Sequence, residues 1–216
     1  MSLFAPLYAE EELQPRMESA YKELGFRDAK VSPPKFSVLR HSKDTEEVDV
    51  VIRVEPGSRS FLGEIRFENE QQFPSDRLRS LFPMQEGDPF NPTAVGVGLE
   101  GLRKLYATEG YAEFVAVPQL VCDEAQHRID LVISLDAGQQ YSFGRLFLEG
   151  TEQHAGAAKE LWHAWQAVEG QHYNPSLLNR WLLANFSDPS AAADPQRIVT
   201  SSHSESRTVD IKLLLP

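Results

Sequence analysis

The sequence predicts an α+β protein made of tandem modules, each with two helices on one face of a three-stranded mixed sheet. Three kinds of phrase return after 80 to 83 positions: a pair of glycines six apart, an alternating apolar run around an aspartate, and a helix entry that ends in Asn-Pro. They lie at Gly57–Gly63 and Gly138–Gly144, around Asp49, Asp130 and Asp210, and at Gly87–Pro92 and Gly170–Pro175. Because modules of about 80 residues bury little surface alone, neighbouring modules are expected to support one another.

The composition is that of an ordinary globular protein, with 216 residues, 41% of them hydrophobic and 25% charged. A net charge of −11 argues against a nucleic acid or an anionic lipid surface as the main partner. The single cysteine, Cys122, excludes an intramolecular disulfide and a four-cysteine metal site. No apolar run is long enough for a membrane helix and Met1–Ala9 has no signal sequence, so we expect this chain to be soluble. Met1–Leu3 is equally compatible with a start added to a shortened protein.

The middle module supplies the clearest leading strand and first helix. Apolar and polar positions alternate from Phe61 to Glu68, the period-2 pattern of a half-buried strand. Ser75 can cap a short helix whose apolar side is formed by Leu78, Leu81 and Phe82.

A longer second helix is predicted to start at Asn91-Pro92, because Asn caps free backbone amides and Pro suits the first helical position. Its apolar face is formed by Val95, Leu99, Leu102 and Tyr106. Three glycines inside this helix, Gly96, Gly98 and Gly101, predict that the first helix or the sheet packs close to its backbone. Gly110 is the expected C-terminal stop.

The module is expected to end in a hairpin of two strands, Glu113–Cys122 and Ile129–Leu135, joined by a turn at 123–127. Pro118 lies within the first of these strands. Since proline cannot donate to a strand ladder, this strand is predicted at the edge of the sheet and Ile129–Leu135 at its centre.

The first module shows only the second half of this order. A helix carrying Leu13 to Leu24 ends at Gly25, an outgoing segment follows to Pro33, and Val48–Val54 closes the module. The Pro33-Pro34 pair again marks a sheet edge. A leading strand and first helix are missing, which suggests that the sequence begins inside a repeat.

The third module starts like the middle one, with a strand at Tyr141–Leu148, a helix carrying three apolar residues, and a second helix from Asn174-Pro175. The apolar residues of that first helix are Leu161, Trp162 and Trp165. The module then departs from the repeat, because a loop is predicted at 187–195 where Gly110-Tyr111 stood in the middle module.

The motifs of the middle module resemble polypeptide-transport-associated (POTRA) domains of outer-membrane assembly factors and surface-antigen proteins. The resemblance is carried by Glu55-Pro56-Gly57, Gly87-Asp88-Pro89-Phe90-Asn91, and Leu99, Leu102-Arg103, Leu105-Tyr106 and Gly110-Tyr111. It implies a partial module at 1–56, a complete one at 57–135 and a divergent one at 136–216.

The resemblance implies a noncatalytic role in the bacterial periplasm or at the outer membrane, in protein assembly or transport. Such domains bind envelope accessory proteins and unfolded or nascent outer-membrane β-barrel polypeptides, often by adding a strand to a sheet edge. The edge residues expected to bind are Phe114, Val115, Ala116, Val117 and Gln119 in the middle module, and Ile198, Val199 and Thr200 in the third. An inserted loop near 187–195 could cover the edge of the third module.

No catalytic, cofactor or metal site is predicted. The spacing of His154, His163 and His172 does not suit one helix face, so solvated surface histidines are the favoured interpretation. The run Ser201–Glu205 contains Ser, His and Glu but is interpreted as a hairpin turn rather than a triad. Gly96, Gly98 and Gly101 fall inside a helix rather than before one, which argues against a dinucleotide site.

The tryptophans Trp162, Trp165 and Trp181 are interpreted as packing residues, with an exposed aromatic patch for apolar peptides as the alternative. For the whole chain, the alternative to a binding module is a structural spacer between a membrane anchor and another envelope protein. An enzyme is the third possibility, but the sequence offers no converging polar groups that would form an active site.

Overall fold

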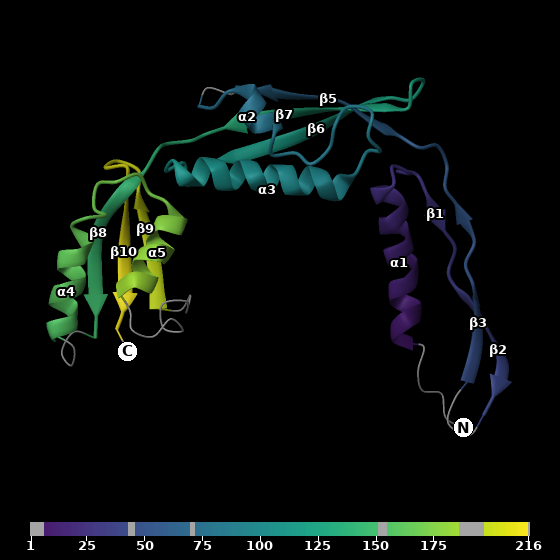
Figure 1. Ribbon diagram of the computed structural model, residues 1–216, viewed down its shortest axis with the longest axis horizontal. Coiled ribbons are helices and arrows are strands. Elements are labelled where there is room, and N and C mark those ends of the chain that lie inside the picture. Colours follow the sequence, from purple (N-terminus) through teal and green to yellow (C-terminus); the bar gives the residue numbers. More distant parts are fainter. Residues whose placement is uncertain (1–6, 43–45, 70–71, 151–154, 186–196, 216) are drawn as a thin grey trace. The chain divides into compact units, whose positions relative to one another are not determined.

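A computed structural model describes residues 7–42, 46–69, 72–150, 155–185 and 197–215 (Figure 1). The chain divides into two compact units. One contains residues 1–68, 75–98 and 118–133, and the other contains 69–74, 99–117 and 134–216. The division runs through the middle module, whose residues are shared between the two units.

The middle module has the predicted order of strand, helix, helix, strand, strand (Figure 1). Its elements are β5 (Phe61–Glu68), α2 (Ser75–Arg79), α3 (Pro92–Thr108), β6 (Val115–Asp123) and β7 (Arg128–Asp136). The sheet order is β5-β7-β6, which confirms the edge position that Pro118 predicted for β6 and the central position of β7. The central strand carries the core, since Ile129, Leu131 and Ile133 are buried.

The helix α3 is held at both ends by the residues that predicted it. The Asn91 side chain accepts a hydrogen bond from the Ala94 amide at 3.1 Å. Gly110 has a φ of +89°, and the Tyr111 amide donates back to the Tyr106 carbonyl. Within the helix, the Phe82 ring lies against Gly98, where no side chain would fit, so the predicted close approach is confirmed there. A Cβ at Gly96 would meet nothing within 4 Å, so the close approach predicted there is wrong.

The third module repeats this order with β8 (Ser142–Glu149), α4 (Ala155–Trp165), α5 (Pro175–Asn185), β9 (Ile198–His203) and β10 (Thr208–Leu214). Its sheet is mixed, because β10 pairs parallel with β8 and antiparallel with β9. The buried cluster joins the helix face of the sheet to both helices, with the Trp165 ring perpendicular to those of Phe143 and Trp181. The loop predicted at 187–195 lies outside the described residues.

The middle and third modules contain the same contact between a glycine of the first strand and an aspartate of the central strand. In β8 the two residues Gly144 and Arg145 oppose the single residue Asp210 of β10. The Asp210 carboxylate accepts a hydrogen bond from the Arg145 amide at 2.8 Å. A Cβ at Gly144 would collide with that carboxylate, which explains why a glycine stands at this position.

The middle module shows the same arrangement with its own residues. Asp130 accepts a hydrogen bond from the Glu64 amide at 2.9 Å, and a Cβ at Gly63 would collide with Asp130. The glycine and aspartate repeats seen in the sequence are therefore two halves of one contact.

The first module contains α1 (Leu7–Glu23), β1 (Lys30–Val31), β2 (Lys35–His41), β3 (Glu46–Val51) and β4 (Val54–Glu55). The predicted single strand Val48–Val54 is wrong, because β3 pairs with β2 while β4 pairs with β1. The break between them is held by Ser32, whose hydroxyl accepts from the Arg53 amide and whose own amide donates to the Arg53 carbonyl. The strand β2 follows directly after Pro33-Pro34 and was not predicted.

Candidate functional site

The edge strand β6 of the middle module is the main candidate for binding another polypeptide. It pairs with β7 on one side and ends the three-stranded sheet on the other. Unpaired backbone amides and carbonyls at such an edge form a template for an added strand.

Side chains along β6 are exposed to a degree that sets it apart from its neighbours in the sheet. None of its residues is buried, whereas five residues of β7 are. Val115 and Val117 are 51% and 58% exposed, and they share one face of the strand with Gln119 and Val121. Apolar side chains on a free edge are unusual, because they invite pairing with another strand.

The predicted site residues are placed as follows. Val115, Ala116, Val117 and Gln119 lie in β6, with Ala116 half-buried and the others exposed. Phe114 lies just before the strand and stacks its ring on Tyr106 at 3.9 Å between centroids, so its assignment to the edge strand is wrong. The aromatic contact draws Phe114 towards the helix rather than along the edge. Val121 was missed, although the alternation that predicts Val115 and Val117 extends to it.

The second candidate edge, β9, is also placed at the end of its sheet. Ile198 packs against the core, Val199 is exposed, and Thr200 pairs with Ile211 of β10. Beyond these residues the strand is polar, with Ser201, Ser202 and His203. The two edges thus offer backbone groups of the same kind but side chains of different chemistry.

The C-terminus of each long helix contacts the start of the next module in the chain. In the first compact unit, the Leu24 carbonyl accepts from Arg59 and the Gly25 carbonyl accepts from the Ser60 amide. In the second unit, the carbonyls of Glu109 and Gly110 accept from Gln140 and Tyr141.

These contacts satisfy helix carbonyls that would otherwise lack partners, so each module supplies part of the preceding helix cap. We call the two contacts the joints. The second joint is reinforced by the Tyr141 hydroxyl, which donates to Glu113 at 2.9 Å. That hydrogen bond raises the pKa of Tyr141.

Electrostatics near the β6–β7 turn are dominated by local pairs. The Arg128 guanidinium donates to Asp130 at 2.8 Å and, together with the Glu64 amide, holds the pKa of Asp130 below its ordinary value. At the end of β6, the Arg27 guanidinium donates to the exposed sulfur of Cys122 at 2.9 Å.

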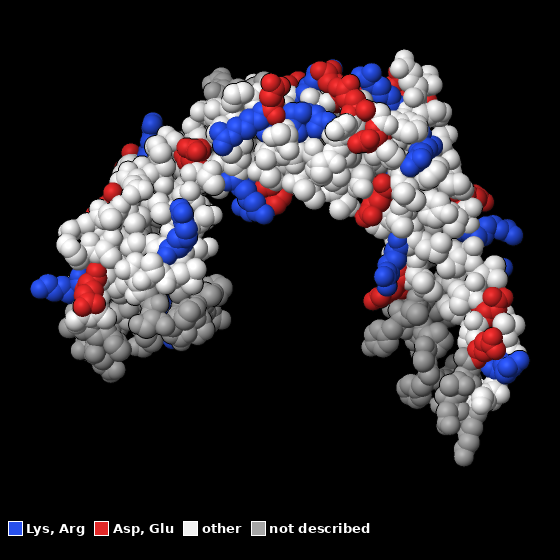
Figure 2. All heavy atoms as spheres, in the orientation of Figure 1, with Lys and Arg blue, Asp and Glu red and all other residues white. Residues whose placement is uncertain are grey.

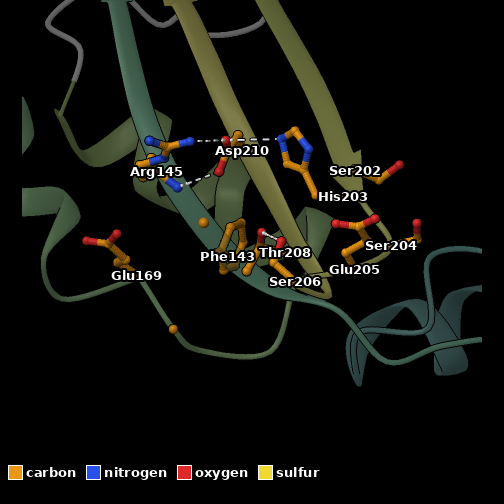
Figure 3. A pocket seen from close by; sticks show the side chains of 12 residues that line it. Phe143, Arg145, Glu169, Ser202, His203, Ser204, Glu205, Ser206, Thr208 and Asp210 are labelled. Atoms are coloured by element: carbon orange, nitrogen blue, oxygen red, sulfur yellow. Dashed lines mark hydrogen bonds and ion pairs between the residues drawn. The ribbon is translucent and has the colours of Figure 1, made fainter.

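An open hollow of about 790 Å³ lies over one end of the third module's sheet (Figure 3). In it, His203 and Arg145 both reach the Asp210 carboxylate, at 3.1 and 3.6 Å (Figure 3). Ser206 contacts the Thr208 hydroxyl instead of the imidazole. The run Ser201–Glu205 includes the end of β9 and the first residues of the turn at 204–207, so the hairpin interpretation is confirmed.

Among the described residues, no group of three or more His, Cys, Asp or Glu side chains could hold a metal ion. His154 lies outside the described residues. Of the three tryptophans, Trp165 and Trp181 are buried as predicted. Trp162 is half-exposed, and its indole N–H donates to the Leu146 carbonyl of β8.

Acidic and basic side chains are interspersed over the face shown in Figure 2, without an extended basic area among the described residues of that view. Within the described part of the chain, no helix combines the length and the apolar character needed to cross a bilayer.

Comparison with known proteins identifies one segment of the chain. Residues 61–138 match the family model POTRA, described as surface antigen variable number repeat. A search of curated proteins found no match.

Several solved structures align with this chain, and the first of those that follow has a similar fold. POTRA domains 3–5 of Haemophilus influenzae BamA align at 17% identity over 95% of this chain and 80% of that chain, with a TM-score of 0.61. BamA from Haemophilus ducreyi lacking POTRA domains 1–3 aligns at 18% identity over 66% of this chain and 27% of that chain, with a TM-score of 0.46. POTRA domains 1–3 of Omp85 from Anabaena align at 14% identity over 94% and 80% of the two chains, with a TM-score of 0.38.

Proposed function

Since the chain contains a POTRA domain at residues 61–138 within a fold like that of successive BamA POTRA domains, we propose that it is a noncatalytic protein-binding segment. It acts in outer-membrane protein assembly or polypeptide transport in the bacterial periplasm. Its partners are unfolded or nascent outer-membrane polypeptides and accessory proteins of the envelope.

The binding mode that we propose is strand addition to β6. The observation that carries it is the combination of a free sheet edge with side chains that are all at least partly exposed, several of them apolar. A strand of alternating apolar and polar residues could pair with the β6 backbone and place its apolar side chains beside Val115 and Val117. The edge β9 is a second and weaker site of the same kind, because Ile198 is directed to the core and the strand continues with polar residues.

A peptide titration tests this mode. An isotope-labelled chain is titrated with a synthetic peptide of about ten alternating valine and threonine residues flanked by lysines, and amide NMR shifts are followed. Saturable shifts should concentrate at Val115–Val121. Replacing Val117 by Glu should weaken binding about tenfold, because it places a charge beside the added strand's apolar side chains. The matched variant Val199→Glu, on the other edge, should leave the shifts at β6 unchanged.

Absence of shifts at β6 up to about 1 mM peptide would contradict strand addition there. Equal weakening by Val117→Glu and Val199→Glu would indicate a nonspecific charge effect instead.

A structural spacer remains the second candidate function, and the repeated joints favour it. Each joint fixes helix-terminal carbonyls with groups from the next module, so the contacts are specific rather than those of a loose linker. If peptide binding is absent and disruption of a joint alone impairs the parent protein, the spacer function is the better description.

A further inference from the structure

The sheet of the third module has two edges, and the first strand β8 forms the edge opposite β9. Among the described residues, β8 has a neighbouring strand, β10, on one side only. The strand is largely apolar: Phe143 and Leu146 are buried in the core, and Phe147 is exposed. An apolar edge of this kind invites pairing with another strand, and proteins commonly cover such an edge with a helix or a loop.

The backbone of β8 turns Leu146 and Leu148 towards this edge. The Glu149 carbonyl accepts from the Leu215 amide, on the side of β10, and the register is regular from Leu146 to Glu149. Because the backbone groups of successive residues in a strand point to opposite sides, those of Leu148 and Leu146 point away from β10. These two residues would supply the hydrogen bonds to a strand added at β8.

Trp162 binds one of these edge groups. It lies on α4, which packs beside β8, and its indole N–H donates to the Leu146 carbonyl at 3.2 Å (Figure 1). Because that carbonyl points away from β10, the indole lies across the free edge rather than over the face of the sheet. Trp165, on the same side of the helix, donates to the Gly144 carbonyl at 2.9 Å. The two indoles therefore follow β8 along α4.

The middle and third modules both cover the start of this edge with a loop. The loop before the second helix pairs with Leu62 of β5 in the middle module and with Phe143 of β8 in the third. Arg79 stands 83 positions before Trp162, the same offset that separates the two helix entries. The Arg79 guanidinium donates to carbonyls of the loop that follows α2. At equivalent positions, one side chain thus binds its own loop and the other binds the strand edge.

We propose that Trp162 closes the β8 edge against an added strand and so restricts strand addition in the third module to β9. The proposal rests on the binding mode proposed above, and it names a residue that decides which edge can be used. A strand arriving at β8 has to take the Leu146 carbonyl from the indole and displace the ring from the edge. This role separates the half-exposed Trp162 from Trp165 and Trp181, which lie in the core.

The test compares two sheet edges in one titration. The isotope-labelled full chain and its Trp162→Ala variant are titrated with the alternating valine–threonine peptide, and amide shifts at β8 and at β6 are followed separately. The unchanged chain should show no saturable shift at Leu146–Leu148 up to about 1 mM peptide. The variant should show saturable shifts there, with an affinity at least about tenfold above that limit.

Two further variants complete the test. His163→Ala alters the exposed neighbour of Trp162 on α4 and should leave the β8 edge closed. Trp162→Phe keeps a ring but removes the N–H donor, so it should bind peptide at β8 more weakly than Trp162→Ala. If Trp162→Ala unfolds the third module, seen as loss of the Trp165 indole signal, saturable shifts at β8 in Trp162→Phe are the deciding result.

Three results would overturn the proposal. They are peptide binding at β8 in the unchanged chain, no binding at β8 in the folded variants that lack the indole, and an equal gain of binding in His163→Ala. Shifts at β6 are evaluated independently, because β6 belongs to another sheet. Their absence would contradict the function proposed for β6, whereas binding at β8 only after loss of the indole would still support the role of Trp162.

Discussion

The middle and third modules share one element order and one glycine–aspartate contact, yet different side chains contact the aspartate. In the middle module Asp130 is bound by Arg128 of its own strand. In the third module Asp210 is contacted by Arg145 of β8 and His203 of the edge strand β9. The glycine–aspartate contact is thus common to both modules, while the side chains that bind the aspartate come from different strands.

The modules also differ in the side chains that join the first helix to the rest of the core. The middle module places Phe82 after a helix of five residues, against Gly98 of α3. The third module uses Trp165 at the end of α4, in contact with Phe143 and Trp181. The core of the third module should therefore be sensitive to the loss of Trp165, whose ring contacts two other large rings.

The largest effect is expected from Trp165→Ala. Trp165 is 2% exposed and its indole donates to the Gly144 carbonyl, so its removal leaves a cavity and an unpaired acceptor. The free energy of unfolding of the third module should fall by about 3 to 5 kcal/mol. Trp162→Ala is the matched control, because Trp162 is 48% exposed on the same helix and should cost about 1 kcal/mol. Denaturant unfolding followed by module-specific NMR signals measures both, and equal losses would contradict the assigned packing.

The next largest losses of stability are expected from replacing the two aspartates, and they should differ between the two modules. Asp210 is 7% exposed, and Asp210→Ala leaves the Arg145 amide without its acceptor, at a cost of about 2 to 4 kcal/mol. Asp130 is more exposed, so Asp130→Ala should cost about 1 to 2 kcal/mol. Both values come from denaturant unfolding of the full chain. A larger loss for Asp130→Ala would show that burial does not set the difference.

At the second joint, Gly110→Ala should destabilise the chain by about 2 to 3 kcal/mol. Gly110 has a positive φ, and its added Cβ would lie 2.5 Å from the Tyr141 carbonyl oxygen. Gly87→Ala is the control, because Gly87 has nearly the same φ but nothing within 4 Å, so only the backbone strain of about 1 kcal/mol applies. Thermal unfolding of both variants measures the steric part, and equal shifts would contradict a tight joint.

The parts of the fold that local chemistry determines were predicted from the sequence. Asn91 and Gly110 bound α3 because caps act over a few residues, and Pro118 placed β6 at the edge because it lacks an amide proton. The division of Val48–Val54 into two strands was not predicted, since it depends on Ser32, which is distant in sequence from Arg53.

In the candidate site too, the sequence pattern does not predict the position of a side chain that packs on another helix or strand. Val115 and Val117 keep the alternation of their strand, so their exposure follows from the pattern. Phe114 does not, because its ring stacks on Tyr106 of α3. A contact of this kind depends on how helix and strand pack, which sequence periodicity does not specify.

The smallest effect is expected on the pH dependence of unfolding. It tests whether the Arg128–Asp130 pair stabilises the middle module through charge. The pKa of Asp130 is lowered in the folded protein by Arg128 and by the Glu64 amide. A lowered folded-state pKa means that the ionised carboxylate stabilises the fold above the unfolded value of about 4, and that this stabilisation is lost as the pH falls through the folded value.

Unfolding of the middle module should therefore become easier as the pH is lowered below about 4, and the Asp130→Asn variant should show a weaker dependence on pH in that range. Denaturant midpoints measured at several acidic pH values provide the comparison. An unchanged slope in the variant would mean that other carboxylates account for the acid sensitivity, and that the pairing of Asp130 with Arg128 contributes through geometry rather than through charge.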